Sequence, residues 1–193
     1  HPALATDAEG VSRTFISQDF TSSGTTDDTN GHGTHVAGII ASSDSTYEGV
    51  APGVDNLINA KHLGGVTSDT LAALDWAITN PSDGAEILSN SWGMATDSCD
   101  DIGFTYSDGE TTYSTKYIDA AVDYYDTISV NAAGNDGLCG FYSLTAPADS
   151  YNAIVVGAVD DQGTVARNDD LIADYSSIGP TWDERKKPDL VAI

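Results

Sequence analysis

The sequence predicts an α/β fold built on a mainly parallel β-sheet. Three observations support this prediction. Segments with the apolar character of strands alternate with segments whose apolar residues recur at helical spacing. The segment 152–160, NAIVVGAVD, is almost continuously apolar, which is typical of a strand buried on both faces. Polar, glycine-containing stretches follow two other predicted strands, at the position where the functional loops of parallel sheets lie.

The predicted elements follow this alternation along the chain. An apolar helix is expected at 35–42, after a glycine-rich loop, and a short strand at 56–63. Leu71, Leu74 and Ile78 recur near helical spacing, which predicts a second helix at 68–79. The remaining elements are predicted strands at 85–93, 127–135 and 152–160 and a helix at 115–125. The stretches SNSWG and NAAGN close two of these strands and are therefore candidate functional loops.

Composition excludes several classes of function. The 193 residues suffice for one domain with a sizeable core. Thirty acidic and seven basic residues give a net charge of −23, which would repel a nucleic-acid backbone. No apolar run approaches the roughly 20 residues that span a membrane. We therefore expect neither a nucleic-acid nor a membrane partner. The acidic surface is suited to a secreted protein, and a saline environment would screen its self-repulsion.

The segment 29–42, TNGHGTHVAGIIAS, carries the strongest chemical signal. His32 lies between two glycines, which leave room for a substrate backbone, and its imidazole can act as a general base near neutral pH. A capping or packing histidine would fit the same local pattern. His35 gives an H-x-x-H spacing that could bind a metal, but the glutamate of a metalloprotease helix is absent and no third ligand is evident.

Five segments together resemble the subtilisin-like serine proteases (subtilases), in the order of that family. The similar segments are the histidine segment, GVAPGV (49–54), LSNSWG (88–93), NAAGNDG (131–137) and the run 175–193 that in the family leads toward the nucleophilic serine. The resemblance covers essentially the whole chain. It implies a three-layer αβα sandwich with a mainly parallel central sheet, present here as a single partial domain, 1–193, incomplete at both ends.

The resemblance assigns a role to each matching residue. His32 would be the general base, His35 would pack beneath it, and Asn135 would donate its side-chain amide to the oxyanion. A backbone edge on which an extended peptide pairs would come from Ser91, Trp92 and Gly93. The wall of the pocket for the residue before the scissile bond would come from Ala132, Ala133 and Gly134. Small residues in this wall leave room for a large side chain, although ordinary close packing would select them as well.

The other two members of the catalytic triad do not occur in these 193 residues. The family carries its aspartate in Asp-Thr-Gly or Asp-Ser-Gly and its serine in Gly-Thr-Ser-Met-Ala, and neither motif is present. None of Asp7, Asp19, Asp27 and Asp28 lies in such a motif, and they are interpreted as loop or surface acids. Ser176 and Ser177 are interpreted as turn residues. We expect an inactive internal fragment of a serine endopeptidase, able to form homo-oligomers through surfaces exposed by truncation. The alternative is a catalytically dead peptide-binding module of the same fold.

The resemblance also bears on disulfides and metals. It places Cys99 and Cys139 on loops that face each other across the specificity pocket, so a bridge is expected, with two separate thiols as the alternative. No cofactor is required and no metal ligand is assigned. Structural calcium is known in the family, but Ala3 stands where a ligand aspartate usually follows His-Pro. The acidic run 96–101 could hold a hard cation.

Overall fold

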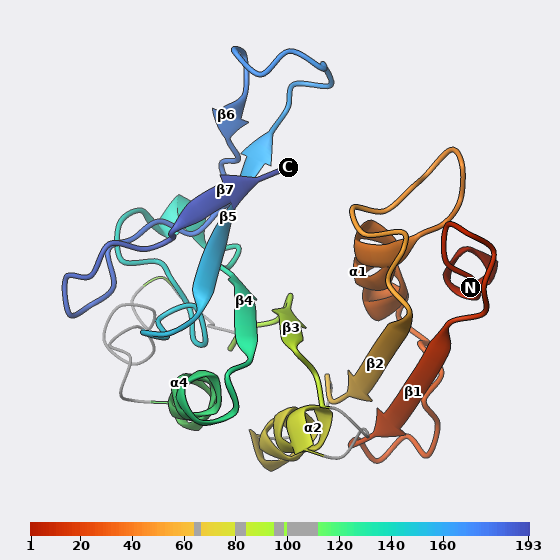
Figure 1. Cartoon of the computed structure of the whole chain (residues 1–193). Helices are drawn as coiled ribbons and strands as arrows, with labels where there is room; N and C mark the ends of the chain where they lie inside the picture. The colour runs from red at the N-terminus through yellow and green to blue at the C-terminus, as the bar shows by residue number, and fades with distance from the viewer. Residues whose placement is uncertain (64–66, 80–83, 95–98, 100–111) are drawn as a thin grey trace. The chain divides into compact units, whose positions relative to one another are not determined.

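A computed structural model describes residues 1–63, 67–79, 84–94, 99 and 112–193. These residues form two compact units, His1–Ala85 and Glu86–Ile193, which we describe separately. Figure 1 shows the elements of both units. No helix in the described part of the chain is both long and apolar enough to cross a bilayer.

The first unit is a parallel strand pair with two helices. Its elements are η1 (Pro2–Leu4), β1 (Thr14–Asp19), α1 (His32–Ala41), β2 (Asn56–Lys61) and α2 (Thr67–Thr79). β1 and β2 pair in parallel from Thr14 opposite Asn56 to Asp19 opposite Lys61. α1 lies between them in the sequence, so β1, α1 and β2 form a β-α-β crossover.

Two details of the first unit differ from the predicted elements. α1 begins at His32, so the catalytic candidate lies in its first turn rather than in the loop before it. β1 was not predicted, because TFISQD mixes polar and apolar residues and most of its side chains are exposed or only half-buried. α2 buries Ala73, Leu74, Ala77 and Ile78, as its spacing predicts.

The second unit contains the larger sheet. Its elements are β3 (Ile87–Asn90), α4 (Tyr113–Tyr125), β4 (Ile128–Ala132), η2 (Gly137–Cys139), β5 (Ile154–Asp160), β6 (Leu171–Ile172) and β7 (Leu190–Ala192). β3 pairs with β4, β4 with β5, and β5 with β7, all in parallel, whereas β6 pairs with β5 antiparallel. The strand pairings of both units therefore confirm the prediction of mainly parallel β-structure.

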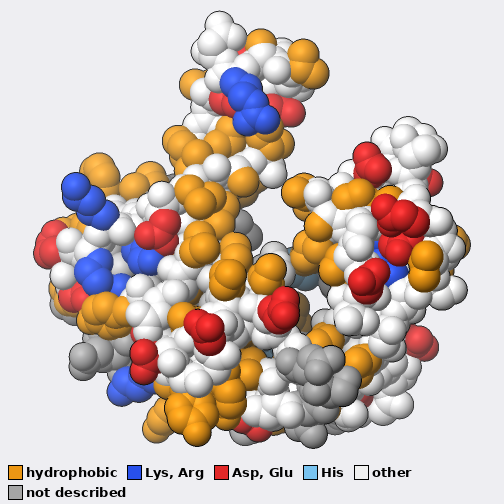
Figure 2. Space-filling view, in the orientation of Figure 1, with side chains coloured by type: hydrophobic (Ala, Val, Ile, Leu, Met, Phe, Trp, Pro, Cys, Tyr) orange, Lys and Arg blue, Asp and Glu red, His pale blue; other side chains and the backbone are white. Residues whose placement is uncertain are grey.

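The core of the second unit lies on one side of β5. Val155 is fully buried and packs in a cluster with Ala133, Leu144 and Ala148. Ile154, the preceding residue of the same strand, is 40% exposed, because neighbouring side chains of a strand point to opposite faces. The prediction that this strand is buried on both faces is therefore wrong. Leu190 and Val191 of β7 are also exposed, and Figure 2 shows hydrophobic side chains along this part of the unit.

Candidate active site

Asp28 organises the turn that presents His32. Gly31 precedes α1 with φ of 95°, a left-handed conformation that glycine adopts without strain. The Asp28 carboxylate accepts hydrogen bonds from Gly31 N (2.7 Å), Thr34 N (2.7 Å) and Thr34 Oγ1 (2.7 Å). It thereby satisfies backbone donors that the first turn of a helix leaves without partners. The backbone N–H of Gly31, followed by that of Thr34, holds the pKa of the Asp28 carboxyl well below its usual range.

The loop before α1 is held by a second carboxylate and by a lysine. Asp19 accepts hydrogen bonds from Thr21, Ser23 and Gly24, and the Thr21 hydroxyl is the main reason why the pKa of Asp19 falls to about 2. The Lys61 ammonium donates to Ser23 Oγ (2.9 Å) and to the carbonyl oxygens of residues 25 (2.8 Å) and 27 (2.9 Å). Asp28 is an exposed loop acid and Asp19 a half-buried one at the end of β1, and each also holds nearby backbone in place, a role that the sequence did not indicate.

His32 and His35 are both exposed on α1. His35 was expected to pack beneath the base, and its exposure contradicts that expectation. The two histidines lie three residues apart in the first helical turn, where they share an open face. Across residues 1–63, 67–79, 84–94, 99 and 112–193, no three His, Cys, Asp or Glu side chains gather as a metal site would require.

In the second unit, the predicted substrate edge and pocket wall lie side by side. β3 ends at Asn90 and β4 at Ala132, and the parallel register sets Asn90 opposite Asn131. Ser91, Trp92 and Gly93 therefore leave the sheet beside the stretch formed by Ala132, Ala133, Gly134 and Asn135. Of these residues, Gly93 and Asn135 are exposed, whereas Ala133 is buried.

A buried polar network lies beneath both loops. The Asn90 side-chain amide donates to Asn131 Oδ1 (3.0 Å) and to Ser129 Oγ (3.1 Å). Trp92 Nε1 donates to Asn90 Oδ1 (3.1 Å), and Asn131 Nδ2 donates to the carbonyl oxygen of Pro147 (2.9 Å). Asn90 and Asn131 are 5% and 0% exposed, so each hydrogen bond satisfies a group that water cannot reach. The available sequence signal for this network was an asparagine within the last two residues of each strand.

The loop that carries Asn135 is fixed by Ser177. Gly134 has φ of 112°, and its carbonyl oxygen accepts from Ser177 N (3.1 Å). Asp136 N donates to Ser177 Oγ (3.0 Å), and Ser176 Oγ accepts from Ala158 N (2.9 Å). Ser176 and Ser177 are each 2% exposed, so these hydroxyls hold backbone in place. The Asn135 side chain stays accessible at the end of this anchored loop.

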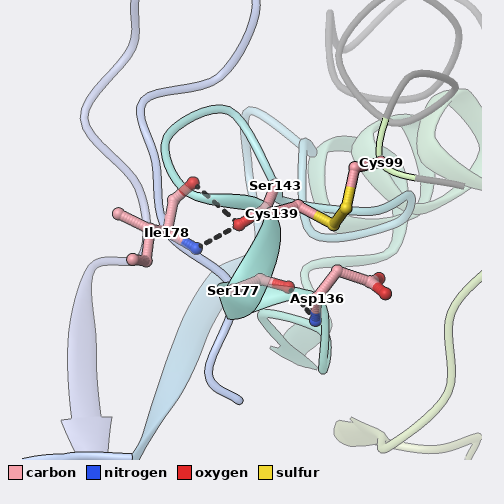
Figure 3. The surroundings of a disulfide bond; sticks show 6 residues. All are labelled: Cys99, Asp136, Cys139, Ser143, Ser177 and Ile178. Atoms are coloured by element: carbon pink, nitrogen blue, oxygen red, sulfur yellow. Dashed lines mark hydrogen bonds between the residues drawn. A yellow bond between two sulfur atoms is a disulfide. The ribbon is translucent and has the colours of Figure 1, made fainter. Parts of the chain in front are cut away.

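A disulfide closes the same loop. Cys99 and Cys139 are bonded, with Cα atoms 5.3 Å apart, as the resemblance implied. Figure 3 shows this bond beside Asp136 and Ser177, and also the double contact of Ser143 with Ile178. In that contact Ser143 Oγ accepts from Ile178 N (2.8 Å) and donates to Ile178 O (3.4 Å). Except for Cys99, the acidic run 96–101 lies outside the described residues.

The structure thus brings the predicted substrate edge, pocket wall and oxyanion donor together within the second unit. His32 belongs to the first unit.

Comparisons with known proteins identify the family of this chain. The model of the Subtilase family, Peptidase_S8, matches residues 1–193. Serine protease AprX of Bacillus subtilis (strain 168) is 34% identical over 177 residues, which cover 86% of this chain and 38% of AprX. Subtilisin DY of Bacillus licheniformis is 32% identical over 160 residues, which cover 79% of this chain and 52% of subtilisin DY. The chain therefore spans about a third to a half of these relatives.

Solved structures give the same result. The structure titled "Sphericase" superimposes with a TM-score of 0.58 at 27% identity and covers 84% of this chain and 52% of its own. The prenylagaramide maturation protease PagA superimposes with a TM-score of 0.57 at 27% identity and covers 87% of this chain and 52% of its own. These neighbours bear out the prediction of a subtilisin-like α/β sandwich.

Proposed function

This chain belongs to the subtilase family of serine proteases, and on that premise we propose that it forms part of the catalytic domain of a secreted serine endopeptidase. In this proposal the chain supplies the general base, His32, and the oxyanion donor, Asn135. The observation that carries it is the anchored loop after β4, which leaves the Asn135 side chain exposed beside the edge at Ser91–Gly93. A donor held in place before the reaction need not reorganise when negative charge develops.

Each residue would act at a defined point of the reaction. His32 would take the proton of the serine hydroxyl as that oxygen attacks the peptide carbonyl, and would later pass the proton to the leaving amine. The amide of Asn135 would donate a hydrogen bond to the carbonyl oxygen as that oxygen becomes negative. An extended substrate would pair with the backbone of Ser91–Gly93 as an added strand.

The proposal requires an aspartate and a serine that the 193 residues do not contain in the family's motifs. We therefore propose that the chain is inactive by itself. The exposed apolar residues Leu190, Val191 and Ile193 would favour self-association of the isolated chain. The Cys99–Cys139 bridge suits an oxidising, extracellular compartment, and the acidic surface would keep the protein soluble there. The proposed chemistry needs no cofactor. A structural calcium ion would fit the family, and we assign no ligands to it.

Labelling with a fluorophosphonate tests the proposal, because this probe reacts with an activated serine. The samples are this chain, a version extended at both ends to include the two motifs, and the extended version with His32→Ala. We expect labelling of the extended version alone.

The opposite result would be a folded extended version that fails to label. It would overturn the protease proposal in favour of a peptide-binding module, which keeps the edge at Ser91–Gly93 without catalysis.

A further inference from the structure

Asn30 and Gly31 form the only Asn-Gly pair in the 193 residues, directly before His32. Asparagine is a chemically labile residue, and a following glycine has no side chain to obstruct attack by its backbone nitrogen on the asparagine amide carbon. The new N–C bond closes a succinimide, and the amide nitrogen leaves as ammonia. Water then opens the ring to aspartate or to isoaspartate, in which the main chain runs through the side-chain carbon. The turn that presents His32 therefore contains a position at which the chain can modify itself.

Two features of the structure favour this reaction at Asn30. Asn30 and Gly31 are both exposed, so water and base can reach them. The backbone N–H of His32 donates to Asn30 Oδ1 (3.3 Å), which folds the Asn30 side chain back over the Gly31 peptide. This contact keeps the amide group beside the stretch of backbone that would attack it.

Asp28 opposes the reaction by holding the attacking nitrogen. Its Oδ1 accepts from Gly31 N (2.7 Å) and from Asn30 N (3.1 Å), and its Oδ2 is fixed by Thr34. The Gly31 nitrogen becomes a nucleophile only when it loses its proton, and the adjacent carboxylate disfavours the negative charge that this loss creates. The pKa of the Asp28 carboxyl lies well below its usual range, so this group stays ionised at the neutral and alkaline pH at which deamidation is catalysed by base.

We propose that Asn30 is a latent deamidation site and that Asp28 keeps it closed by holding the Gly31 N–H. The inference goes beyond the proposed function and does not depend on it. Deamidation would add a carboxylate two residues before His32. Isoaspartate would also lengthen the main chain of the turn, so the hydrogen bonds that begin α1 at His32 would no longer fit.

The test follows deamidation of the 193-residue chain during incubation at mildly alkaline pH. Digestion and mass spectrometry locate the conversion of amide to acid, and labelling with an isoaspartate methyltransferase measures the isoaspartate formed. We expect Asp28→Ala to convert Asn30 about 5- to 30-fold faster than the parent, the factor that corresponds to an exposed hydrogen bond to a charged group. Asp28→Asn removes the charge at nearly the same volume and should convert Asn30 faster by a smaller factor. It keeps the inference testable if Asp28→Ala does not fold.

Three controls separate the contact with Gly31 from other effects. Asp27→Ala removes a neighbouring carboxylate and should keep the parental rate. Thr34→Gly loosens the first turn of α1 but leaves the bond from Gly31 N to Asp28 Oδ1 in place, so it should raise the rate much less than Asp28→Ala. Asn168 is exposed and followed by aspartate, and its conversion, read from the same digest, should be slow and equal in all samples.

Two results would overturn the inference. If folded Asp28→Ala and Asp28→Asn convert Asn30 no faster than the parent, Asp28 does not keep the site closed. If Thr34→Gly converts Asn30 as fast as Asp28→Ala, the order of the first helical turn sets the rate and the hydrogen bond from Gly31 does not.

Discussion

Replacing Asp28 by alanine is expected to lower the stability of helix α1 by about 1–2 kcal/mol. Loss of a helix-capping side chain costs about 0.5–2 kcal/mol, and loss of a carboxylate near the positive end of a helix adds about 0.3–1 kcal/mol. Asp28 is exposed, so water can replace its bonds to the N–H groups of Gly31 and Thr34. The loss should therefore stay well below that for a buried group.

Hydrogen exchange of the α1 amides measures this loss directly. A loss of about 1–2 kcal/mol corresponds to amide exchange about 5- to 30-fold faster. Asp27→Ala is the matched control, because Asp27 contributes its backbone carbonyl to Lys61 and its backbone N–H to Thr25. The reasoning is refuted if the two variants exchange equally fast, or if Asp28→Ala exchanges as slowly as the parent.

The effect of Asp28 should also depend on pH with a defined sign. The pKa of Asp28 is lowered in the folded chain, so its contribution is fully present above the pKa of an unfolded aspartate, about 3.9. It is lost as the pH falls toward the folded pKa, where the folded carboxylate takes up its proton. The difference in α1 exchange between the parent and Asp28→Ala should thus be constant above about pH 5 and should shrink below pH 4.

Three further outcomes follow from the site. Asn131→Ala leaves the buried amide of Asn90 without one acceptor and should lower the free energy of unfolding of the second unit by about 1–3 kcal/mol, measured with urea. An unchanged urea midpoint would contradict the role of the network. Asn135→Ala in the extended version should lower kcat about 100- to 1000-fold with little change in KM, a magnitude established on subtilisin itself. A change in KM alone would argue against an oxyanion role for Asn135. The Cys99–Cys139 bridge joins residues 40 apart in the sequence, and its reduction should lower the free energy of unfolding by about 3–4 kcal/mol. Reduced and oxidised forms with the same urea midpoint would refute this prediction.

Much of the fold could be predicted from local pattern. α2 matches its predicted segment to within one residue, and the strands β3 to β5 lie within theirs, because their apolar residues repeat at the period of the element. β1 could not be predicted in this way, since its exposed and half-buried positions impose no clear apolar pattern. The single-sided burial of β5 depends on what covers each face of the sheet, which the strand's own residues do not specify.

The residues of the candidate site also fall into those that the sequence could indicate and those that it could not. Residues in recognisable motifs, such as His32 and Asn135, could be identified from the sequence. The role of Asp28 could not, because it depends on where its side chain lies relative to the backbone of the following residues. An aspartate in an acidic loop is ordinary in sequence and becomes specific through its contacts.

The contacts of Lys61 determine how the loop before His32 responds to dilution and to chelators. Three oxygen atoms surround the Lys61 ammonium in the way that oxygen ligands surround a bound metal ion. A metal ion leaves its site when its concentration falls or when a chelator competes for it. The ammonium is covalently attached to β2 and cannot be diluted or removed. This stretch of chain is therefore held by a cation that belongs to the chain itself and that a chelator cannot remove.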